Sequence, residues 1–418
     1  METSDITLAL ENFTLENDFN LFHDKAKNTH IQDVRINDII INKYTNEFWT
    51  SKQRQSNSIH EVSYRACFKP QLPNFFIEKL TEKDDIVYDP FLGRGTTAIE
   101  AGLRGRNIIG NDINPLSKIF TEGRLHIPDT NKLFNYLNNL ELNEEVNDHH
   151  DLDMFFHEET LNEILNLRNY ILRKEKDNDL NHLDKWVRMV ATNRLTGHSK
   201  GFFSVYTMPP NQAVSRKRQI KINEKRQQKP EYKNIRKIIF KKSKSLLRDI
   251  NQQDMSNLKK AYTKSIFLNN DASRTKEIEH NQVKLIITSP PFLDIVQYSK
   301  DNWLRLWFNG IDFEDLDKKI TMSKTLADWS TKMQDVFHEF YRILKPGGFV
   351  AFEVGEIKNG KIKLDEYVLP LGIKANLNPI CIIINQQEFT KTANIWGVSN
   401  NKTGTNSNRI ILFQKQKL

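Results

Sequence analysis

The chain has 418 residues, of which 38% are hydrophobic and 27% are charged, as is typical of globular proteins. It contains no run of about 18 apolar residues and no basic N-terminal region followed by an apolar run, so we expect neither a membrane span nor a secretory signal. Its two cysteines, Cys67 and Cys381, are too few for a disulfide framework or a cysteine-based zinc site, which points to a cytoplasmic protein.

The net charge of +8 is concentrated in one segment. Between Ser215 and Arg248 there are fourteen Lys or Arg residues and two acidic residues, Glu224 and Glu231, so this window carries +12 and the rest of the chain is slightly acidic. A charged helix that only faces solvent is one explanation of such a run. The one-sided balance favours another, an anionic partner that binds at this place.

The first clear structural pattern follows a polar stretch without motifs, residues 1–59. An apolar strand at 86–88 leads into a turn with two glycines, then a helical pattern from Ala98, then a second strand at 107–110 that is followed by the acidic residue Asp112. This order of elements is a βαβ unit, which predicts a parallel α/β sheet.

The same pattern resumes in the last third of the chain. We expect strands at 265–268, 283–288, 349–354, 379–385 and 409–414, and an amphipathic helix at 329–344. The apolar run 283–288 is typical of a strand that is buried on both faces. Residues 126–261 lie between the two halves and contain amphipathic helical stretches and the basic window, so we interpret them as an inserted recognition region.

The turn after the first strand has the composition of a ligand site. In Phe91-x-Gly93-x-Gly95, the glycines allow backbone N–H groups to approach a ligand at the start of a helix. Asp112 is placed to accept hydrogen bonds from ribose hydroxyls. A helix-capping role for Asp112 before Pro115 is the alternative.

Several segments resemble the motifs of amino-directed, site-specific DNA methyltransferases, which act on cytosine N4 or adenine N6. Asp89–Thr97 and Gly110–Pro115 are similar to the family's S-adenosylmethionine motifs. Ser63–Pro73 resembles the segment that closes over the methionine part of this cofactor, and Asn270-Asp271-Ala272 resembles the segment with the adenine-contacting acid. Leu344–Gly348 fits the helix stop of class I methyltransferases.

The resemblance implies S-adenosyl-L-methionine as the cofactor. It implies the cofactor-binding residues Phe68, Pro70, Asp89, Phe91, Gly93, Gly95, Thr96, Asp112 and Asp271. The implied fold is an α/β, class I, Rossmann-like methyltransferase domain with a mostly parallel seven-stranded sheet. Residues 60–125 and 262–418 would form this catalytic domain, residues 1–59 an N-terminal extension, and residues 126–261 the inserted basic target-recognition region.

The segment Thr288-Ser-Pro-Pro-Phe292, after a buried strand, carries the predicted reaction chemistry. An exocyclic amine is a poor nucleophile because its lone pair is delocalised into the ring. Ser289 Oγ and the Pro290 carbonyl can accept both amine protons, and Phe292 would stack on a base that has left the duplex. Together with Pro291, these residues form the predicted catalytic set. In isolation, such a tetrapeptide is usually only a rigid loop.

The first residue of this motif bears on the choice of base. In the family, Ser at this place generally accompanies cytosine N4 methylation, whereas Asp or Asn accompanies adenine N6 methylation, so Ser289 implies cytosine N4. Neither Cys67 nor Cys381 is preceded by proline. The Pro-Cys nucleophile of cytosine C5 methyltransferases is therefore missing.

The order of the motifs places target recognition between the cofactor turn and the catalytic tetrapeptide. The predicted DNA contacts, to phosphates or to bases, are Arg216, Lys217, Arg218 and Lys221. Trp303 and Trp307 are candidates for lining the base pocket, although a place in a helix core is at least as good an interpretation.

The sequence thus favours a modification enzyme of a restriction–modification system that methylates a short site in double-stranded DNA, with a cognate restriction endonuclease as partner. The alternatives are an adenine N6 enzyme, an RNA methyltransferase and a catalytically silent DNA-binding subunit. His149, His150 and His157 lie in an acidic stretch without regular ligand spacing, so we expect no metal there.

Overall fold

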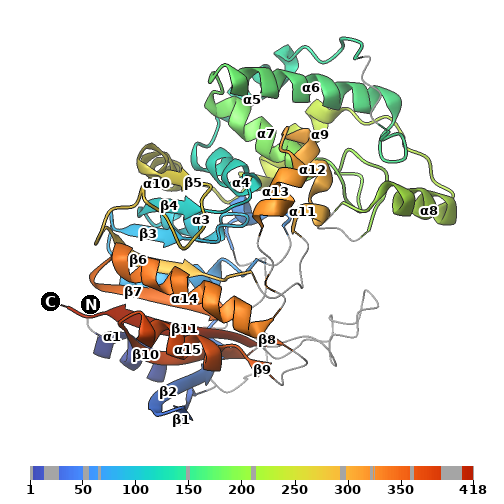
Figure 1. Cartoon of the computed structure of the whole chain (residues 1–418). Helices are drawn as coiled ribbons and strands as arrows, with labels where there is room; N and C mark the ends of the chain where they lie inside the picture. Colours follow the sequence, from blue (N-terminus) through green and yellow to red (C-terminus); the bar gives the residue numbers. More distant parts are fainter. Residues whose placement is uncertain are drawn as a thin grey trace, which may run out of the picture.

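The computed structural model describes residues 3–13, 28–49, 56–64, 67–146, 151–208, 213–291, 298–320, 323, 325–357, 362–386 and 407–417. Two parts stand out in Figure 1, a sheet covered by helices on both faces and a layer of helices beside it. Within the described ranges, no helix has the length and apolar character needed to cross a membrane.

The central sheet has nine strands in the order β1-β2-β10-β11-β7-β6-β3-β4-β5. Their bounds are β1 (His30–Ile36), β2 (Ile39–Asn46), β3 (Ile86–Asp89), β4 (Asn107–Asn111), β5 (Ile266–Leu268), β6 (Val283–Thr288), β7 (Leu344–Val354), β10 (Leu377–Gln386) and β11 (Ser407–Lys415). Strands β5, β4, β3, β6 and β7 are mutually parallel, and β11 is antiparallel to both of its neighbours, β7 and β10. The predicted class I, mostly parallel α/β sheet is confirmed by this arrangement.

Two strands of the central sheet were not predicted from the sequence. β1 and β2 form an antiparallel hairpin, and β2 extends the sheet by pairing in parallel with β10. Most side chains of β1 are exposed, so the strand lacks the alternation of buried and exposed residues by which strands are recognised. The expected seven strands are therefore present, and the polar N-terminal stretch adds two more.

Alternating side chains on the central strands build two hydrophobic clusters. Val87 on β3 faces Leu285 across the sheet and packs with it on one side, whereas the next pair, Tyr88 and Ile286, packs on the other. The first face is covered by α2 (Gln71–Leu80), α3 (Thr96–Leu103), α4 (Leu116–Leu125) and α10 (Gln252–Lys264). The second is covered by α14 (Leu326–Ile343) and α15 (Asp365–Lys374). The continuous apolar run of β6 follows from this burial on both faces.

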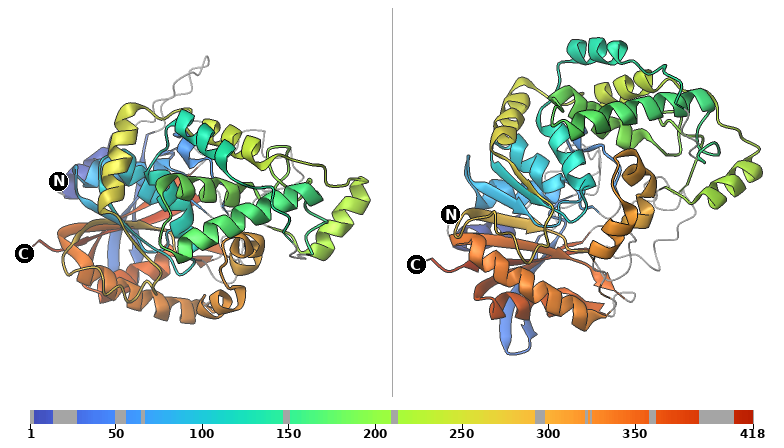
Figure 2. Two further views of the ribbon diagram at one scale, coloured as in Figure 1. Left: turned by 90° about the horizontal axis from the view of Figure 1, so that it is seen from above. Right: turned by 45° about the horizontal axis from the view of Figure 1, so that its top comes forward.

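The helical layer is formed mainly by the inserted residues. It comprises α5 (Thr130–Asn139), α6 (Glu158–Lys176), α7 (His182–Arg194), α8 (Arg216–Arg226) and α9 (Ile235–Leu246). α7 begins at a capping box of Asn181 and Asp184, and its fully buried Trp186 donates a hydrogen bond to Ser243 Oγ of α9 at 2.9 Å. Figure 2 shows α8 at the outer end of this layer, away from the sheet.

A later segment joins the same layer. The short helices α11 (Tyr298–Asp301), α12 (Trp303–Phe308) and α13 (Phe313–Lys319) follow the predicted catalytic tetrapeptide in sequence. Arg188 Nε of α7 donates to Asn309 Oδ1 at 2.7 Å, and Arg168 Nε of α6 donates to the Trp307 carbonyl at 2.9 Å. The chain therefore returns from the sheet to the helical layer after β6.

The remaining elements are short or lie near the chain ends. They are α1 (Thr3–Glu11), the 3₁₀ helix η2 (Ser58–His60), and the two-stranded ribbon of β8 (Glu356–Ile357) and β9 (Ile362–Lys363).

Candidate functional site

A cavity lies at the carboxyl ends of β3, β4, β5 and β6, where ligands bind in open α/β sheets. Seven of the nine predicted cofactor residues line it: Phe68, Asp89, Phe91, Gly93, Thr96, Asp112 and Asp271. Ser289 and Pro291 of the predicted catalytic set line the same cavity. Pro70 and Gly95 are not among its lining residues. The structure thus brings together segments as far apart in the sequence as Phe68 and Pro291.

The glycine turn approaches the cavity with a backbone that L side chains rarely adopt. Gly93 has a φ of +53° and Gly95 a φ of +77°. A Cβ at Gly95 would also overlap the side chain of Thr121 on α4. Gly95 therefore serves close packing between the turn and α4, while Gly93 faces the cavity.

Asp112 orders this turn from the end of β4. Its Oδ2 accepts a hydrogen bond from the Gly93 N–H at 2.8 Å, and its Oδ1 accepts one from the Asn114 N–H at 2.9 Å. Burial raises the pKa of Asp112, and these hydrogen bonds oppose the shift. The first N–H of α4, on Leu116, is bound by Asn114 Oδ1 at 3.1 Å. The start of α4 therefore does not depend on capping by Asp112.

Asp89 joins the ends of the two central strands. Its side chain is 2% exposed, and its Oδ1 accepts hydrogen bonds from Thr288 Oγ1 at 2.7 Å and from the Phe91 N–H at 3.1 Å. Burial raises the pKa of Asp89 to about 7, against the opposing effect of these bonds. Because Ser289 follows Thr288, this carboxyl group also fixes the position from which the tetrapeptide leaves β6.

Asp271 is engaged by a residue that the sequence did not indicate. Its Oδ2 forms an ion pair with Lys332 Nζ of α14, and its Oδ1 accepts bonds from the N–H and the hydroxyl of Ser273 at 2.9 and 2.7 Å. Burial alone would raise the pKa of Asp271, but the bonds from Lys332 and Ser273 outweigh it and hold the pKa below its usual value. Asp271 is therefore a carboxylate beside a cation.

The other cavity residues of α14 were recognised only as the apolar face of a helix. They are Trp329, Met333 and Val336. The periodicity of a helix gives the direction in which a side chain points, but it does not distinguish a neighbouring sheet from a cavity wall. Nothing in the sequence could therefore have separated these residues from ordinary core.

The tetrapeptide is held from two sides. Ser289 is half-buried and its hydroxyl hydrogen-bonds the buried carboxyl group of Glu353 on β7, whose pKa is raised by burial against the effect of this bond. The Pro291 carbonyl accepts a hydrogen bond from Trp329 Nε1 of α14 at 3.1 Å. Pro290 is buried, and Phe292 lies outside the described residues.

These groups fit the cofactor that the sequence implies. Backbone N–H groups of the glycine turn, the Asp112 carboxylate and the Asp271 carboxylate offer donors and acceptors for a nucleoside. The apolar side chains of Phe68 and Phe91 supply surfaces for flat or aliphatic parts of a ligand.

The predicted DNA contacts all lie at the start of α8. Arg216, Lys217, Arg218 and Lys221 are exposed. The guanidinium of Arg216 lies 4.9 Å from the ring centre of Trp303, and its Nε donates to the Asp151 carbonyl at 2.8 Å. Arg216 therefore also anchors α8 to the helical layer.

The two tryptophans of α12 are part of the helix packing. Trp303 Nε1 donates to the Val214 carbonyl at 3.2 Å, and the Arg168 guanidinium lies 5.4 Å from the ring centre of Trp307. Neither tryptophan lines the cavity, which supports the helix-core interpretation. His157 accepts a bond from the Glu159 N–H at the start of α6, while His149 and His150 lie outside the described residues.

Comparisons with known proteins agree with this geometry. Residues 12–119 match the family model of the N6 and N4 methyltransferases, described as DNA methylase. The Type II methyltransferase M.BsoBI of Geobacillus stearothermophilus is 23% identical over 321 residues, which cover 69% of this chain and 60% of that protein. The Type II methyltransferase M.MjaII of Methanocaldococcus jannaschii is 34% identical over 84 residues, which cover 20% of this chain and 16% of that protein. The chain thus spans less than two thirds of either relative.

Among solved structures, a TehB-like S-adenosylmethionine-dependent methyltransferase from Corynebacterium glutamicum aligns over 82% of this chain and 87% of its own, with a TM-score of 0.31 and 7% identity. The sequence matches are more specific, because the segment that matches the DNA methylase model contains the glycine turn and Asp112 of the cavity described above. Residues 12–119 of this chain are accordingly similar to the amino-directed DNA methyltransferases, and the cavity fits S-adenosylmethionine as the cofactor.

Proposed function

We propose that this protein methylates the exocyclic N4 amine of cytosine at a short site in double-stranded DNA. The observation that carries the proposal is the shared cavity, in which Ser289 and Pro291 lie against the same space as the glycine turn, Asp112 and Asp271. A methyl donor and an amine acceptor can meet only if both sites open into one cavity.

The contacts of Ser289 suit an acceptor of amine protons. A serine hydroxyl has one proton to donate and two lone pairs that accept. When the proton is directed to the Glu353 carboxylate, both lone pairs of Ser289 Oγ are available to the amine. The Pro290 carbonyl supplies a further acceptor. Two acceptors hold both amine protons and so favour a geometry in which the nitrogen lone pair points away from the ring plane.

Bound S-adenosylmethionine supplies an electrophilic methyl group on a sulfonium. Ser289 and the Pro290 carbonyl would hold the amine that receives this methyl group in exchange for one of its protons. The hydrogen bond between Ser289 and Glu353 offers a place for that proton on its way to solvent. The residues of this chain thus orient the amine and remove its proton.

The substrate proposal rests on the helical layer. α8 carries six Lys or Arg residues and only one acidic residue, Glu224, as expected of a surface that binds a polyphosphate. We assign residues 126–261 to target recognition, residues 60–125 and 262–418 to catalysis, and residues 1–59 to an N-terminal extension. Relatives named as Type II methyltransferases support a modification enzyme, and the proposal includes a cytoplasmic location and a cognate restriction endonuclease as partner.

The decisive experiment identifies the methylated nucleoside. The protein is incubated with duplex DNA and labelled S-adenosylmethionine, and the DNA is digested to nucleosides and analysed. N4-methylcytosine is the expected product. N6-methyladenine would correct the base, labelling of RNA alone would correct the substrate, and DNA binding without labelling would indicate a silent subunit.

The role of Ser289 has a test of its own. Ser289→Ala removes the hydroxyl acceptor, so turnover should fall by a factor of about 100 or more, as when a single transition-state hydrogen bond is removed. Cofactor affinity, measured by calorimetry, should stay within about twofold, because Ser289 is assigned to the amine. Loss of cofactor binding in Ser289→Ala would contradict this assignment.

A further inference from the structure

One wall of the cavity is built from a segment with little regular structure. This wall segment, residues 59–64 and 67–68, begins within η2 and contributes Tyr64, Cys67 and Phe68 to the cavity. It belongs to no strand or α-helix, so no ladder of backbone hydrogen bonds holds it in place. Its position must come from side chains of neighbouring elements.

Arg94, between the two glycines of the turn, supplies such contacts. Its side chain is 6% exposed. Nη1 donates to the Val62 carbonyl at 3.1 Å, Nη2 donates to the Phe68 carbonyl at 3.4 Å, and Nε donates to Thr96 Oγ1 at 3.1 Å. One planar guanidinium therefore connects two separate points of the wall segment to the start of α3.

Arg124 of α4 contacts the backbone of Arg94 and of the wall segment. It is 0% exposed, and its Nη1 donates to the Ile59 carbonyl at 3.2 Å while Nη2 bonds the carbonyl of Arg94 itself. Burial, with a smaller contribution from the nearby Arg94, lowers the pKa of Arg124 to about 9. Across the part of the chain that the structure describes, neither arginine forms an ion pair with a carboxylate.

Two buried guanidiniums that bind only neutral oxygens are costly for the folded state. Taking such a charge out of water costs several kcal/mol unless it is well paired, and an apolar side chain of similar volume would fill the space at lower cost. Stability alone therefore gives a poor account of Arg94. The geometric account is better, because a guanidinium can hold several backbone carbonyls at fixed distances at once.

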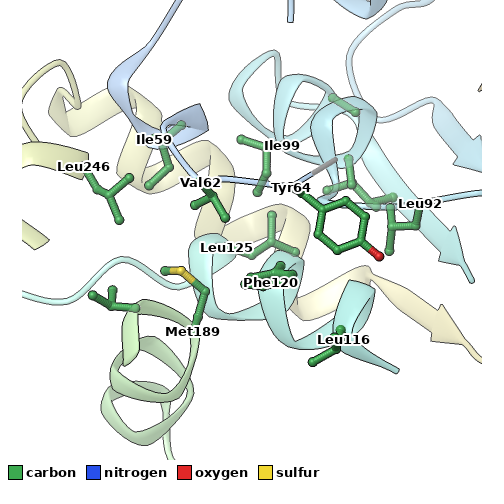
Figure 3. Close-up of a cluster of buried hydrophobic side chains, with 14 of the residues drawn as sticks. Ile59, Val62, Tyr64, Leu92, Ile99, Leu116, Phe120, Leu125, Met189 and Leu246 are labelled. Carbon is green, nitrogen blue, oxygen red and sulfur yellow. The ribbon is translucent and has the colours of Figure 1, made fainter. Parts of the chain in front are cut away.

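The wall segment also has apolar anchors that do not depend on Arg94. Figure 3 shows Ile59, Val62 and Tyr64 against side chains of α3 and α4, among them Ile99 and Phe120. The rings of Tyr64 and Phe120 are 5.8 Å apart between centres. These anchors lie at residues 59–64. At the far end, Cys67 and Phe68 pack against the same core, and Arg94 adds a polar contact from the Phe68 carbonyl to the glycine turn.

We infer that Arg94 is a positioning residue that holds the wall segment in its ligand-binding geometry before the cofactor arrives. The inference deepens the proposed function, because it names a residue that sets cofactor affinity through Phe68 and Cys67 without touching the reacting atoms. The backbone N–H of Arg94 also bonds the sulfur of Cys67, which adds a third link to the same wall.

The test compares Arg94→Gln with the control Arg104→Gln. Arg104 lies at the other end of α3 on the surface, where it contacts Asn74 and Glu78, away from the cavity. For Arg94→Gln we expect the Kd for S-adenosylmethionine, measured by calorimetry, to rise about tenfold, equivalent to about 1.4 kcal/mol, with kcat at saturating cofactor within about twofold of wild type. For Arg104→Gln we expect both constants to stay at the wild-type values.

Amide hydrogen exchange of the ligand-free protein provides a second readout. Exchange at residues 67–68 should accelerate in Arg94→Gln and not in Arg104→Gln, since only the former releases this end of the wall segment. Arg94→Lys keeps the charge but can reach fewer carbonyls, so its Kd should lie between those of wild type and Arg94→Gln. This milder variant also serves if Arg94→Gln does not fold.

Unchanged exchange and affinity in Arg94→Gln would overturn the inference, as would a loss confined to kcat. Failure of the proposed function looks different. If wild-type protein methylates another base or RNA, the affinity and exchange comparisons remain valid. If wild-type protein does not bind S-adenosylmethionine, the exchange comparison still decides whether Arg94 fixes the wall segment.

Discussion

The single buried carboxyl group of Asp89 makes the stability of the whole fold depend on pH. Because its pKa is raised to about 7, the folded state keeps the proton while the unfolded state releases it at a pH of about 4. Stability from this group is fully present below pH 4, is lost as the pH rises to about 7, and is constant above that.

Asp89→Asn should remove this dependence. The amide oxygen can still accept the bonds from Thr288 and Phe91, which both go to Oδ1, so the local geometry is retained. At pH 8, the free energy of unfolding measured with urea should exceed that of wild type by up to about 4 kcal/mol, and at pH 4 the two should be nearly equal.

Asp271→Asn is the matched control with the opposite sign. The pKa of Asp271 is lowered in the folded state, so its contribution is present at neutral pH and is lost as the pH falls below about 4. Asp271→Asn should therefore be less stable than wild type at pH 7. Parallel pH profiles for wild type and Asp89→Asn would show that burial of Asp89 has no such effect.

At the residue scale, the sequence indicated most of the cavity but not its contacts. Gly93, Asp112 and Ser289 stand next to strands with clear patterns, and residues at the ends of adjacent parallel strands must meet. The ion pair of Asp271 with Lys332 joins residues 61 positions apart, and no local pattern marks it. The bond between Ser289 and Glu353 is of the same kind, since it depends on the register of β6 and β7.

At the scale of one element, the basic side chains of α8 form two groups that differ in their contacts. Gln219 is its only fully buried residue. The guanidiniums of Arg216 and Arg226 stack on Trp303 and Tyr206, with distances of 4.9 and 3.8 Å to the ring centres. By contrast, four exposed cations have no such stacking contact within the described ranges: Lys217, Arg218, Lys221 and Lys225. We expect the four to bind phosphates.

A variant with these four residues changed to Gln should bind duplex DNA more weakly at every salt concentration. Each lost phosphate contact reduces the magnitude of the slope of log Kobs against log salt concentration by about 0.9, so the four together should reduce it by about 3 to 4. Fluorescence anisotropy at several salt concentrations measures this slope.

The double variant Arg216→Gln, Arg226→Gln is the control on the same helix. It removes two charges but also two stacking contacts, so its melting temperature should fall more than that of the fourfold variant. If the fourfold variant left the salt slope unchanged, α8 would not be the phosphate-binding element.

The elements that the sequence missed have a common physical reason. β1 is largely exposed, and the buried residues of β2 do not alternate strictly with exposed ones, so neither strand shows the regular alternation by which strands are recognised. α11 and α13 are four and seven residues long, and such short helices show too few turns to reveal a buried face. The long helix α14 and the fully buried β6, by contrast, were predicted close to their observed bounds.

At the scale of the whole molecule, Asn385 joins the N-terminal hairpin to the rest of the sheet. It is 0% exposed on β10, and its Oδ1 accepts hydrogen bonds from the N–H groups of Phe48 at 2.8 Å and Trp49 at 3.1 Å, just after β2. Asn385→Ala removes this acceptor from two buried donors, so the free energy of unfolding should fall by about 2 to 4 kcal/mol.

Denaturation with urea measures this loss, and Asn378→Ala is the control. Asn378 lies on the same strand but is exposed, so its replacement should change stability by less than about 0.5 kcal/mol. Equal losses in the two variants would mean that the bonds from Asn385 do not secure the hairpin.

If residues 126–261 recognise the target, as proposed, the return of the chain to the helical layer after β6 constrains how the protein can acquire a new target sequence. A graft of residues 126–261 from a relative would place foreign α6 and α7 against the host's own α12. The contacts of Arg188 with Asn309 and of Arg168 with Trp307 would then be mismatched. To exchange specificity by recombination, residues 298–319 must therefore be replaced together with residues 126–261. Replacing two separate segments needs two more crossovers than replacing one.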